Sequence, residues 1–256
     1  MSDLLVDRDG PVLRVTFNRP ASHNALTFAM YEGLHDACER ADAEDDVKVL
    51  ALRGAGGRAF VSGTDIAQFE GFDGPAGVAY EERISRVVRR LEDTTVPTVA
   101  VVDGYCIGGG LALAAACDLR IATAASRFGV PVARTLGNCL SMDTYALLLG
   151  HLGPARTLDM LLRARLLSAE EVHAAGFVTQ LADDTAALDA ALAETVDALA
   201  SHAPLSMWAT KQSLVRLRRA GLPNGDDIVE RVYGSADFQA AVRSFGAKER
   251  ATWKGE

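Results

Sequence analysis

The stretch "GYCIGGGLALAAACDLR", residues 104–120, places three consecutive glycines (108–110) at the start of a run of small residues that is typical of a buried helix. It directly follows "TVPTVAVVDG" (95–104), an apolar run typical of a buried strand. Each glycine costs a helix about 1 kcal/mol relative to alanine, so three together need a physical reason. Either two backbone segments approach closely here, or bare N–H groups are presented to a ligand. The glycine spacing alone leaves both readings open.

The first N–H groups of a helix lack partners within the helix and lie at the positive end of its dipole. A second segment, "GRAFVSGTDIAQF" (57–69), offers a similar group, because Gly63 permits a tight bend and Thr64 begins a helical turn. Two such N–H groups from different segments would form an oxyanion hole, in which each donor is worth about 3–4 kcal/mol to a transition state. The alternative is that Asp65 only caps a turn and that the glycines only allow close packing.

The composition narrows the classes of function. The chain has 256 residues, of which 49% are hydrophobic and 23% are charged, so we expect one large domain or a domain with a smaller appendage. The net charge of −8 argues against a general binder of nucleic acid or of anionic membranes. The four cysteines form no C-x-x-C pair and the five histidines show no metal-ligand spacing, so neither a metal site nor a disulfide framework is predicted.

The first ten residues, "MSDLLVDRDG", are acidic and lack an apolar stretch, so we expect neither a signal peptide nor a transit peptide. The most apolar region, 96–117, is interrupted by Asp103 and by glycines, which argues against a membrane span. We therefore expect a cytoplasmic protein.

Strand and helix patterns alternate in the first half of the chain, and helical patterns alone fill the last hundred residues. The expected strands are 12–17, 47–54, 96–102, 118–123 and 126–130. The expected helices are 27–42, 78–93, 140–150, 154–163, 168–175, 185–201, 204–220 and 226–245, with a glycine-rich loop at 70–77. This order predicts an α/β core, which we place in 1–195, followed by a helical region in 196–256.

Common nucleotide-binding and catalytic motifs are absent from the sequence. A dinucleotide fingerprint would need a glycine where Leu113 stands, and no P-loop, G-x-S-x-G elbow or H-E-x-x-H pair occurs. These chemistries are therefore set aside.

Several other segments accompany the glycine stretch in a fixed order. They are "NRPASHNAL" (18–26), "GRAFVSGTDI" (57–66), "DGYCIGGGLALAAACDLRIA" (103–122), "FGVP" (128–131), "LLSAEEVHAAGFV" (166–178), "APLSMWATK" (203–211) and "SFGAKERATWKG" (244–255). In this combination and at this spacing, the chain resembles the crotonase (enoyl-CoA hydratase/isomerase) superfamily over essentially its full length.

The resemblance implies a core of repeated ββα units wound as a spiral. It also implies a helical carboxy-terminal region that takes part in trimerisation and covers the active site, and therefore a homotrimer or a hexamer built as a dimer of trimers. The substrate would be an acyl-CoA thioester, as in fatty acid metabolism, with no metal or other cofactor.

Particular residues acquire roles by the same resemblance. The thioester carbonyl oxygen would accept hydrogen bonds from the backbone N–H groups of Thr64 and Gly109. Lys211 is a candidate for contact with a phosphate across a subunit boundary, and the alternative is a solvated surface lysine. The contacts with the substrate and CoA would map to Ala25, Ser62, Thr64, Asp65, Ile66 and Gly109.

The chain departs from the hydratases of the family at two positions. Those enzymes carry one glutamate where this chain has Ala112 and another where it has Val132. Because the two carboxylates hold and activate the water, hydration by the usual route is not expected. The expected function is an enzyme of the family that stabilises an enolate. Decarboxylation, double-bond isomerisation and a lyase reaction stay open, and the alternative outside catalysis is an acyl-CoA-binding paralogue.

The sequence leaves several candidates for the acid/base group. Asp143 is the first, against the alternative that it only stabilises the start of a helix. Other polar side chains near it are Arg134, Asn138, Cys139 and Ser141. The helix over 78–93 offers four that could reach the acyl group, without ranking them: Tyr80, Glu81, Glu82 and Arg83. His23 and Asp65 are further candidates.

Overall fold

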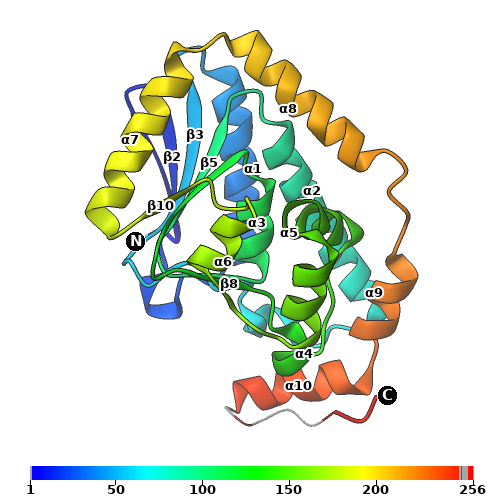
Figure 1. Ribbon diagram of the computed structural model, residues 1–256. Coiled ribbons are helices and arrows are strands. Elements are labelled where there is room, and N and C mark those ends of the chain that lie inside the picture. The colour runs from blue at the N-terminus through cyan, green and yellow to red at the C-terminus, as the bar shows by residue number, and fades with distance from the viewer. Residues whose placement is uncertain (1, 248, 250–252, 256) are drawn as a thin grey trace.

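The computed structural model describes residues 2–247, 249 and 253–255. Residues 248 and 250–252 of the "SFGAKERATWKG" segment lie outside this part. So do residue 1 of the predicted division 1–195 and residue 256 of the predicted division 196–256. Within it, the chain forms two β-sheets surrounded by helices (Figure 1).

Along the middle of the chain, from β3 to β8, consecutive strands alternate between the two sheets. The larger sheet has the strand order β1-β2-β3-β5-β7-β10 and the smaller sheet has the order β4-β6-β8-β9. The strands are β1 (Leu4–Asp9), β2 (Val12–Phe17), β3 (Val49–Gly54), β4 (Ala59–Val61), β5 (Thr98–Val102), β6 (Tyr105–Ile107), β7 (Leu119–Thr123), β8 (Arg127–Gly129), β9 (Leu167–Ser168) and β10 (Gln180–Ala182). A helix follows each of the pairs β3–β4, β5–β6 and β7–β8, so the ββα repeat is confirmed.

The helices are α1 (Phe28–Ala43), α2 (Gly74–Asp93), α3 (Gly109–Ala116), α4 (Val132–Thr135), α5 (Met142–Leu162), α6 (Ala169–Ala174), α7 (Thr185–Ser201), α8 (Pro204–Arg219), α9 (Asp226–Tyr233) and α10 (Ala236–Gly246). Helix α2 takes up half of the predicted loop 70–77. It begins at Gly74 because the side chain of Asp73 accepts a hydrogen bond from the amide of Ala76 and so caps the helix.

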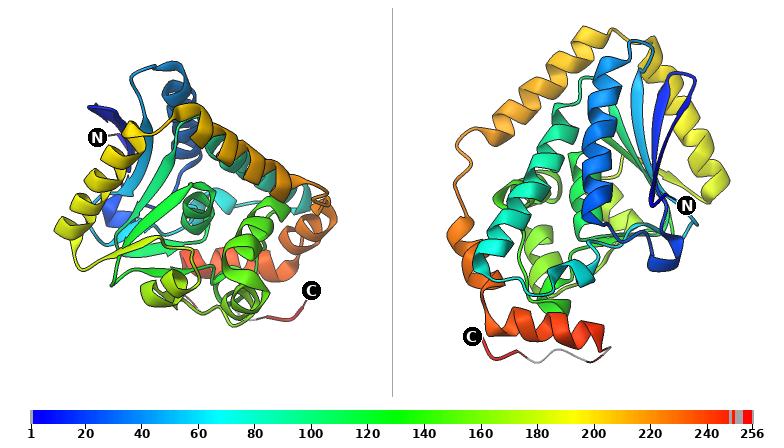
Figure 2. Two further views of the ribbon diagram at one scale, coloured as in Figure 1. Left: turned by 45° about the horizontal axis from the view of Figure 1, so that its top comes forward. Right: turned by 180° about the vertical axis from the view of Figure 1, so that it is seen from behind.

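The larger sheet is buried between helices on its two faces (Figure 2). One face packs against α7 through Leu188, Leu192 and Val196, and the other face forms the main core with α1, α2 and α3. All five residues of β5 are buried as a result. A strand covered on both faces has a continuous apolar sequence, which explains why "TVAVV" shows no alternation.

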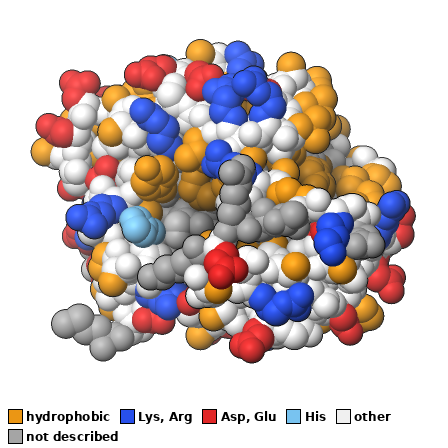
Figure 3. All heavy atoms as spheres, turned by 90° about the horizontal axis from the view of Figure 1, so that it is seen from below, with side chains coloured by type: hydrophobic (Ala, Val, Ile, Leu, Met, Phe, Trp, Pro, Cys, Tyr) orange, Lys and Arg blue, Asp and Glu red, His pale blue; other side chains and the backbone are white. Residues whose placement is uncertain are grey.

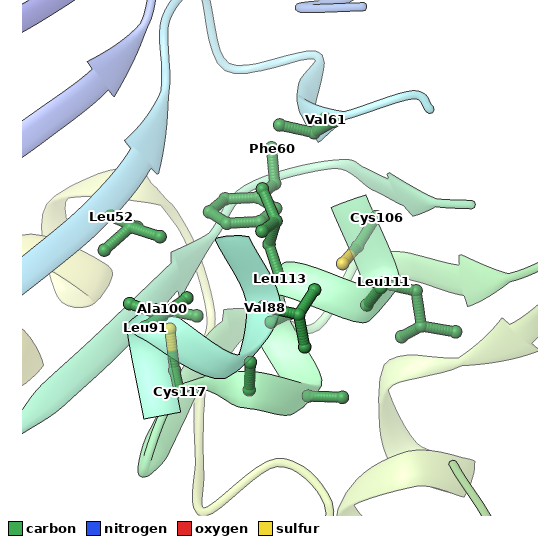
Figure 4. Close-up of a cluster of buried hydrophobic side chains, with 14 of the residues drawn as sticks. Leu52, Phe60, Val61, Val88, Leu91, Ala100, Cys106, Leu111, Leu113 and Cys117 are labelled. Atoms are coloured by element: carbon green, nitrogen blue, oxygen red, sulfur yellow. The ribbon is translucent and has the colours of Figure 1, made fainter. Parts of the chain in front are cut away.

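Helix α3 approaches β4 very closely. Its residues Leu111 and Leu113 are fully buried, and Figure 4 shows them in one apolar cluster with Val61 and Cys106. A Cβ atom at Gly110 would lie only 2.4 Å from the carbonyl oxygen of Val61. The third glycine of the run therefore serves close packing, which was one of the two readings of the sequence.

Helix α9 packs along α2 in a contact that depends on two glycines. A Cβ atom at Gly77 would lie 2.3 Å from the Cβ of Tyr233, and one at Gly74 would lie 2.6 Å from the carbonyl oxygen of Glu230. The chain then turns between α9 and α10, so the prediction of one helix over 226–245 is wrong.

The predicted division after residue 195 falls inside α7, which packs on the larger sheet. Helices α8, α9 and α10 then lead along one side of the molecule to its lower face (Figure 1). On that face apolar side chains lie among acidic and basic ones (Figure 3). The division into 1–195 and 196–256, and the part of the second region in trimerisation, stay predictions.

We predict opposite effects of one substitution at two helical glycines. Gly77→Ala should lower the free energy of unfolding by about 1–3 kcal/mol, because the new Cβ overlaps Tyr233 and overpacking has this effect. Gly150→Ala should raise it by about 0.5–1 kcal/mol, because nothing lies within 4 Å of the new Cβ and alanine favours the helix. Urea unfolding followed by circular dichroism measures both. A more stable Gly77→Ala protein would contradict the packing of α9 on α2.

Candidate active site

The amide of Thr64 faces away from the strand pairing that holds its neighbours. Leu26 pairs with Thr64 in a short parallel bridge: the Leu26 amide donates to the oxygen of Gly63 at 2.8 Å, and the Asp65 amide donates to the oxygen of Leu26 at 2.8 Å. In a parallel ladder, a residue whose two neighbours make these bonds directs its own N–H to the other side. The Thr64 N–H has no acceptor among the described residues.

The other two glycines of the run differ in their roles. Gly108 has φ 56° and ψ −120°, a conformation that side chains exclude, and its N–H donates to the oxygen of Gly129 at 2.9 Å. Gly109 begins α3, and within the described part of the chain nothing accepts its N–H. A Cβ atom at Gly109 would lie 2.4 Å from Oη of Tyr31 and 3.6 Å from Oγ1 of Thr64. The two open amides therefore belong to adjoining segments.

Thr64 and Gly109 line one cavity of about 190 Å³. Ala112 and Val132 line it too. Apolar side chains form much of the remaining wall, among them Ile66, Phe69, Ile84, Ile107, Leu136, Leu140 and Phe245. Because Phe245 belongs to α10, the last helix of the same chain contributes to this wall.

Two tyrosine hydroxyl groups hold the side chain of Thr64. Its Oγ1 lies 2.9 Å from Oη of Tyr31 and 2.7 Å from Oη of Tyr80, within hydrogen-bond distance of both. Burial raises the pKa of Tyr31 and of Tyr80, so both hydroxyls stay protonated near neutral pH. These contacts fix the orientation of Thr64 and therefore the direction of its amide.

Glu81 is the one carboxylate among the described residues that line the cavity. It projects from α2, is 7% exposed, and its Oε1 accepts a hydrogen bond from the hydroxyl of Tyr233 at 2.7 Å. Burial raises the pKa of Glu81 to about 7, although the bonds from Tyr233 and from the backbone of Ser141 oppose the rise. A carboxyl group with this pKa can take up and release a proton near neutral pH, which suits general acid–base catalysis.

The structure does not bring Asp143 into this cavity. Its side chain is buried, and its two carboxylate oxygens accept hydrogen bonds from the guanidinium of Arg89 at 3.0 and 2.6 Å. The pair lines a separate, larger cavity of about 950 Å³. Asp143 also lies in the first turn of α5, where a carboxylate favours the helix dipole. The arrangement fits the structural reading of Asp143 rather than the expected acid/base role.

The predicted contacts with CoA lie on three segments. They are Ala25, Ser62, Thr64, Asp65, Ile66 and Gly109. The side chain of Asp65 accepts a hydrogen bond from the Ala67 amide at 3.3 Å, so its reading as the cap of a turn is confirmed. Arg19 joins two of the segments, because it donates to the oxygen of Ala25 at 2.7 Å and to Asp65 at 3.0 Å. Contact of these residues with CoA stays a prediction.

Of the remaining candidates, Asn138 lines the cavity and the others do not. His23 and Glu82 are exposed, and Arg83 binds a carboxylate on α1. Lys211 is 7% exposed, and its Nζ lies 2.6 Å from a carboxylate oxygen of Asp118. Lys211 is therefore not a surface lysine, and its buried ion pair does not leave it available to a phosphate.

The described residues contain no group of three or more His, Cys, Asp and Glu side chains placed to hold a metal ion. Their four cysteines are buried and unpaired. Of the helices in the same residues, none is both long and apolar enough to cross a bilayer.

The sequence alone did not place Glu81 above its neighbours and did not indicate Tyr233. A signal for Glu81 exists, because Gly77, Tyr80, Glu81 and Ile84 lie at the three- and four-residue intervals of one buried helix face. A carboxylate on such a face is seldom buried without a partner or a function. No sequence signal indicates the contact with Tyr233, because the two residues are 152 positions apart.

Comparison with known proteins identifies the family of this chain. The family model for enoyl-CoA hydratase/isomerase matches residues 7–256. The chain is 29% identical to 2,3-dehydroadipyl-CoA hydratase of Escherichia coli K12 over 100% of both chains. It is 28% identical to the peroxisomal Delta(3,5)-Delta(2,4)-dienoyl-CoA isomerase of Arabidopsis thaliana, over 86% of this chain and 83% of the relative.

A solved structure extends the likeness to three dimensions. The crystal structure of an enoyl-CoA hydratase/isomerase from Xanthobacter autotrophicus Py2 superposes with a TM-score of 0.86 at 28% identity, covering 96% of this chain and 93% of the other. With the ββα repeat and a family match over almost the whole chain, the protein belongs to the enoyl-CoA hydratase/isomerase family.

Proposed function

We propose that the protein is an enzyme that acts on acyl-CoA thioesters, with the thioester oxygen held between the N–H groups of Thr64 and Gly109. The observation that carries the proposal is that these two open amides and the carboxylate of Glu81 line the same cavity. Donors held rigidly at the point where negative charge develops stabilise an enolate without reorganisation. Coenzyme A would enter as part of the substrate, and the proposal needs no other cofactor.

Double-bond migration is the reaction that a single carboxylate supports best. Glu81 would remove a proton from C2 of a 3-enoyl-CoA, and the electron pair would pass to the thioester oxygen as a dienolate between the two amides. The protonated Glu81 would then return the proton to C4, which leaves the double bond between C2 and C3. One proton leaves and one returns, so one group suffices as base and then as acid.

Two competing reactions fit the cavity less well. Hydration would need water held where Ala112 and Val132 present apolar side chains. Decarboxylation would place a substrate carboxylate near Glu81, where two like charges oppose each other. The relatives include both hydratases and an isomerase, so membership of the family does not choose between the reactions.

The cavity also limits the acyl group. A volume of about 190 Å³ is slightly larger than the roughly 150 Å³ of a protein cavity that binds benzene. Together with the apolar wall, this size favours an unsubstituted acyl chain of at most roughly six to eight carbons.

A pair of variants tests the amide of Gly109 in a Tyr31→Phe background, which removes the hydroxyl that a Cβ at this position would meet. Gly109→Ala should keep most of the turnover of the Tyr31→Phe protein because the N–H remains. Gly109→Pro should lower the turnover by about 10²–10³-fold because one oxyanion donor is lost. The helix itself should still form, because proline is tolerated at its first position. The kcat/KM on a short 3-enoyl-CoA measures both. Equal turnover in the two double variants would contradict the role of this amide.

Glu81→Gln should lower kcat by about 10²–10⁴-fold, because it removes the proposed acid/base group. Glu82→Gln is the matched control: this neighbour is exposed, so turnover should not change. Ultraviolet absorbance of the conjugated thioester follows the reaction. Loss of turnover in Asp143→Asn but not in Glu81→Gln would return the acid/base role to Asp143. Binding of acyl-CoA without turnover in the unmodified protein would favour the non-catalytic alternative.

The Glu81→Gln variant should also show a pH-dependent change in the free energy of unfolding relative to the unmodified protein. The folded-state pKa of Glu81 is raised from 4.5 to about 7, so the folded protein binds more protons than the unfolded chain between these values. The free energy of unfolding therefore falls as pH rises through this window. Between pH 5 and pH 8 the stability of Glu81→Gln relative to the unmodified protein should increase by about 2–3 kcal/mol. Chemical unfolding at both pH values measures it, and a constant difference would contradict the raised pKa.

A trimer, or a hexamer built from two trimers, is the assembly that we propose. Helix α8 supports it, because Leu205, Leu214 and Leu217 are 77%, 62% and 73% exposed in the single chain. Such side chains mark a surface that another chain covers. Leu214→Glu combined with Leu217→Glu should shift the mass measured by light scattering from an oligomer to a monomer. A monomeric unmodified protein would rule out the assembly.

A further inference from the structure

Tyr233 brings helix α9 into contact with the carboxylate in the cavity. Its ring is fully buried and packs against Phe69 and Phe238, with ring centroids 6.4 and 4.8 Å away. Its hydroxyl donates to Oε1 of Glu81 at 2.7 Å. The ring can occupy this place only because Gly77 carries no side chain. Packing therefore fixes the position of the hydroxyl.

Asn138 extends this contact. Its Nδ2 donates to Oη of Tyr233 at 3.2 Å. This direction follows from the network, because the hydroxyl of Tyr233 uses its proton in the hydrogen bond to Glu81 and can only accept from Asn138. Oδ1 of Asn138 is buried and has no partner among the described residues. An unpartnered buried acceptor is destabilising, so its presence here needs an explanation.

Glu81 and Tyr233 can each keep a hydrogen-bond partner in both protonation states of Glu81. When Glu81 is ionised, Tyr233 donates to it and the amide of Asn138 donates to Tyr233. When Glu81 is protonated, its own O–H would donate to Tyr233, whose proton would then turn towards Asn138. Rotation of the amide by about 180° would present Oδ1 as the acceptor. The oxygen that lacks a partner now is the one that the protonated state needs.

Tyr233 gives Glu81 its side-chain hydrogen bond, and the backbone of Ser141 gives it a second bond. The charge of Glu81 affects titratable groups on four helices and in the segment before α5, and burial raises the pKa of each, so all are neutral near pH 7. They are Tyr31 on α1, Tyr80 on α2, Cys139 before α5, Tyr145 on α5 and Tyr233 on α9. The ion pair of Arg89 and Asp143 lines the larger cavity, which Glu81 also lines.

We propose that Tyr233 is a positioning residue that forms, with Asn138, a reversible hydrogen-bond relay to Glu81. The relay keeps Glu81 bonded while it takes a proton from the substrate and returns it. The only proton transferred is that of the substrate, because the protons of Tyr233 and Asn138 change direction without leaving their groups. This inference rests on the acid–base role proposed for Glu81.

The test compares pH profiles of kcat. Tyr233→Phe keeps the ring and removes only the hydroxyl, so the pKa of Glu81 should rise and the rising limb of the profile should move up by about one pH unit. At pH 6 kcat should fall about tenfold, and at pH 9 it should stay within about threefold of the unmodified protein. Asn138→Leu should shift the profile in the same direction by less. Tyr145→Phe is the control: Tyr145 feels the charge of Glu81 but bonds the amide of Leu140 instead, so the profile should not move.

A second measurement does not require turnover. Carbon-13 NMR of the Glu81 carboxyl, assigned by its disappearance in Glu81→Gln, reports the pKa of this group directly. A higher pKa in Tyr233→Phe, in a protein that turns over no acyl-CoA, would support the relay and overturn the proposed reaction. An unshifted pKa and profile, with kcat lower at every pH, would overturn the relay while the reaction stands.

Discussion

The site depends on contact between two stretches of bare backbone. A Cβ atom at Gly108 would lie 3.4 Å from Cα of Gly63, and one at Gly110 would lie 2.4 Å from the oxygen of Val61. No side chain can stand between the segments, so the amides that follow, at Thr64 and Gly109, open into the same cavity. The glycines thus serve both readings of the sequence, because close packing is what brings the open amides together.

Polarisation of the thioester and transfer of the proton fall to separate parts of the fold in the proposed mechanism. One amide lies in the segment that follows β4 and the other begins α3, whereas Glu81 comes from α2. The parts meet at Tyr80, which precedes Glu81 and whose hydroxyl lies 2.7 Å from Oγ1 of Thr64. A family can therefore retain the means of binding a thioester while the position of its acid changes, which fits the apolar residues at 112 and 132.

The sequence predicted the local features well because they depend on local chemistry. The ββα repeat was implied by the resemblance to the crotonase superfamily, and the glycines at 63 and 108–110 indicated the two segments that carry the amides of Thr64 and Gly109. The acid/base group was harder to predict, because Asp143 and Glu81 are distinguished only by their partners: Arg89 stands 54 positions from one and Tyr233 stands 152 positions from the other. The spacing of apolar residues predicts which face of a helix is buried, but not which residues of other elements that face contacts. Cytoplasmic location, assembly and independence from a cofactor stay predictions.

The distance between Glu81 and Tyr233 along the chain has a consequence for biosynthesis. A ribosome completes β4, α2 and α3 more than a hundred codons before it reaches Tyr233. A nascent or prematurely terminated chain that lacks α9 therefore contains both amide-bearing segments and Glu81, but it lacks the hydrogen bond from Tyr233 to this carboxylate. The contact that positions Glu81 is then acquired last, when translation is almost finished.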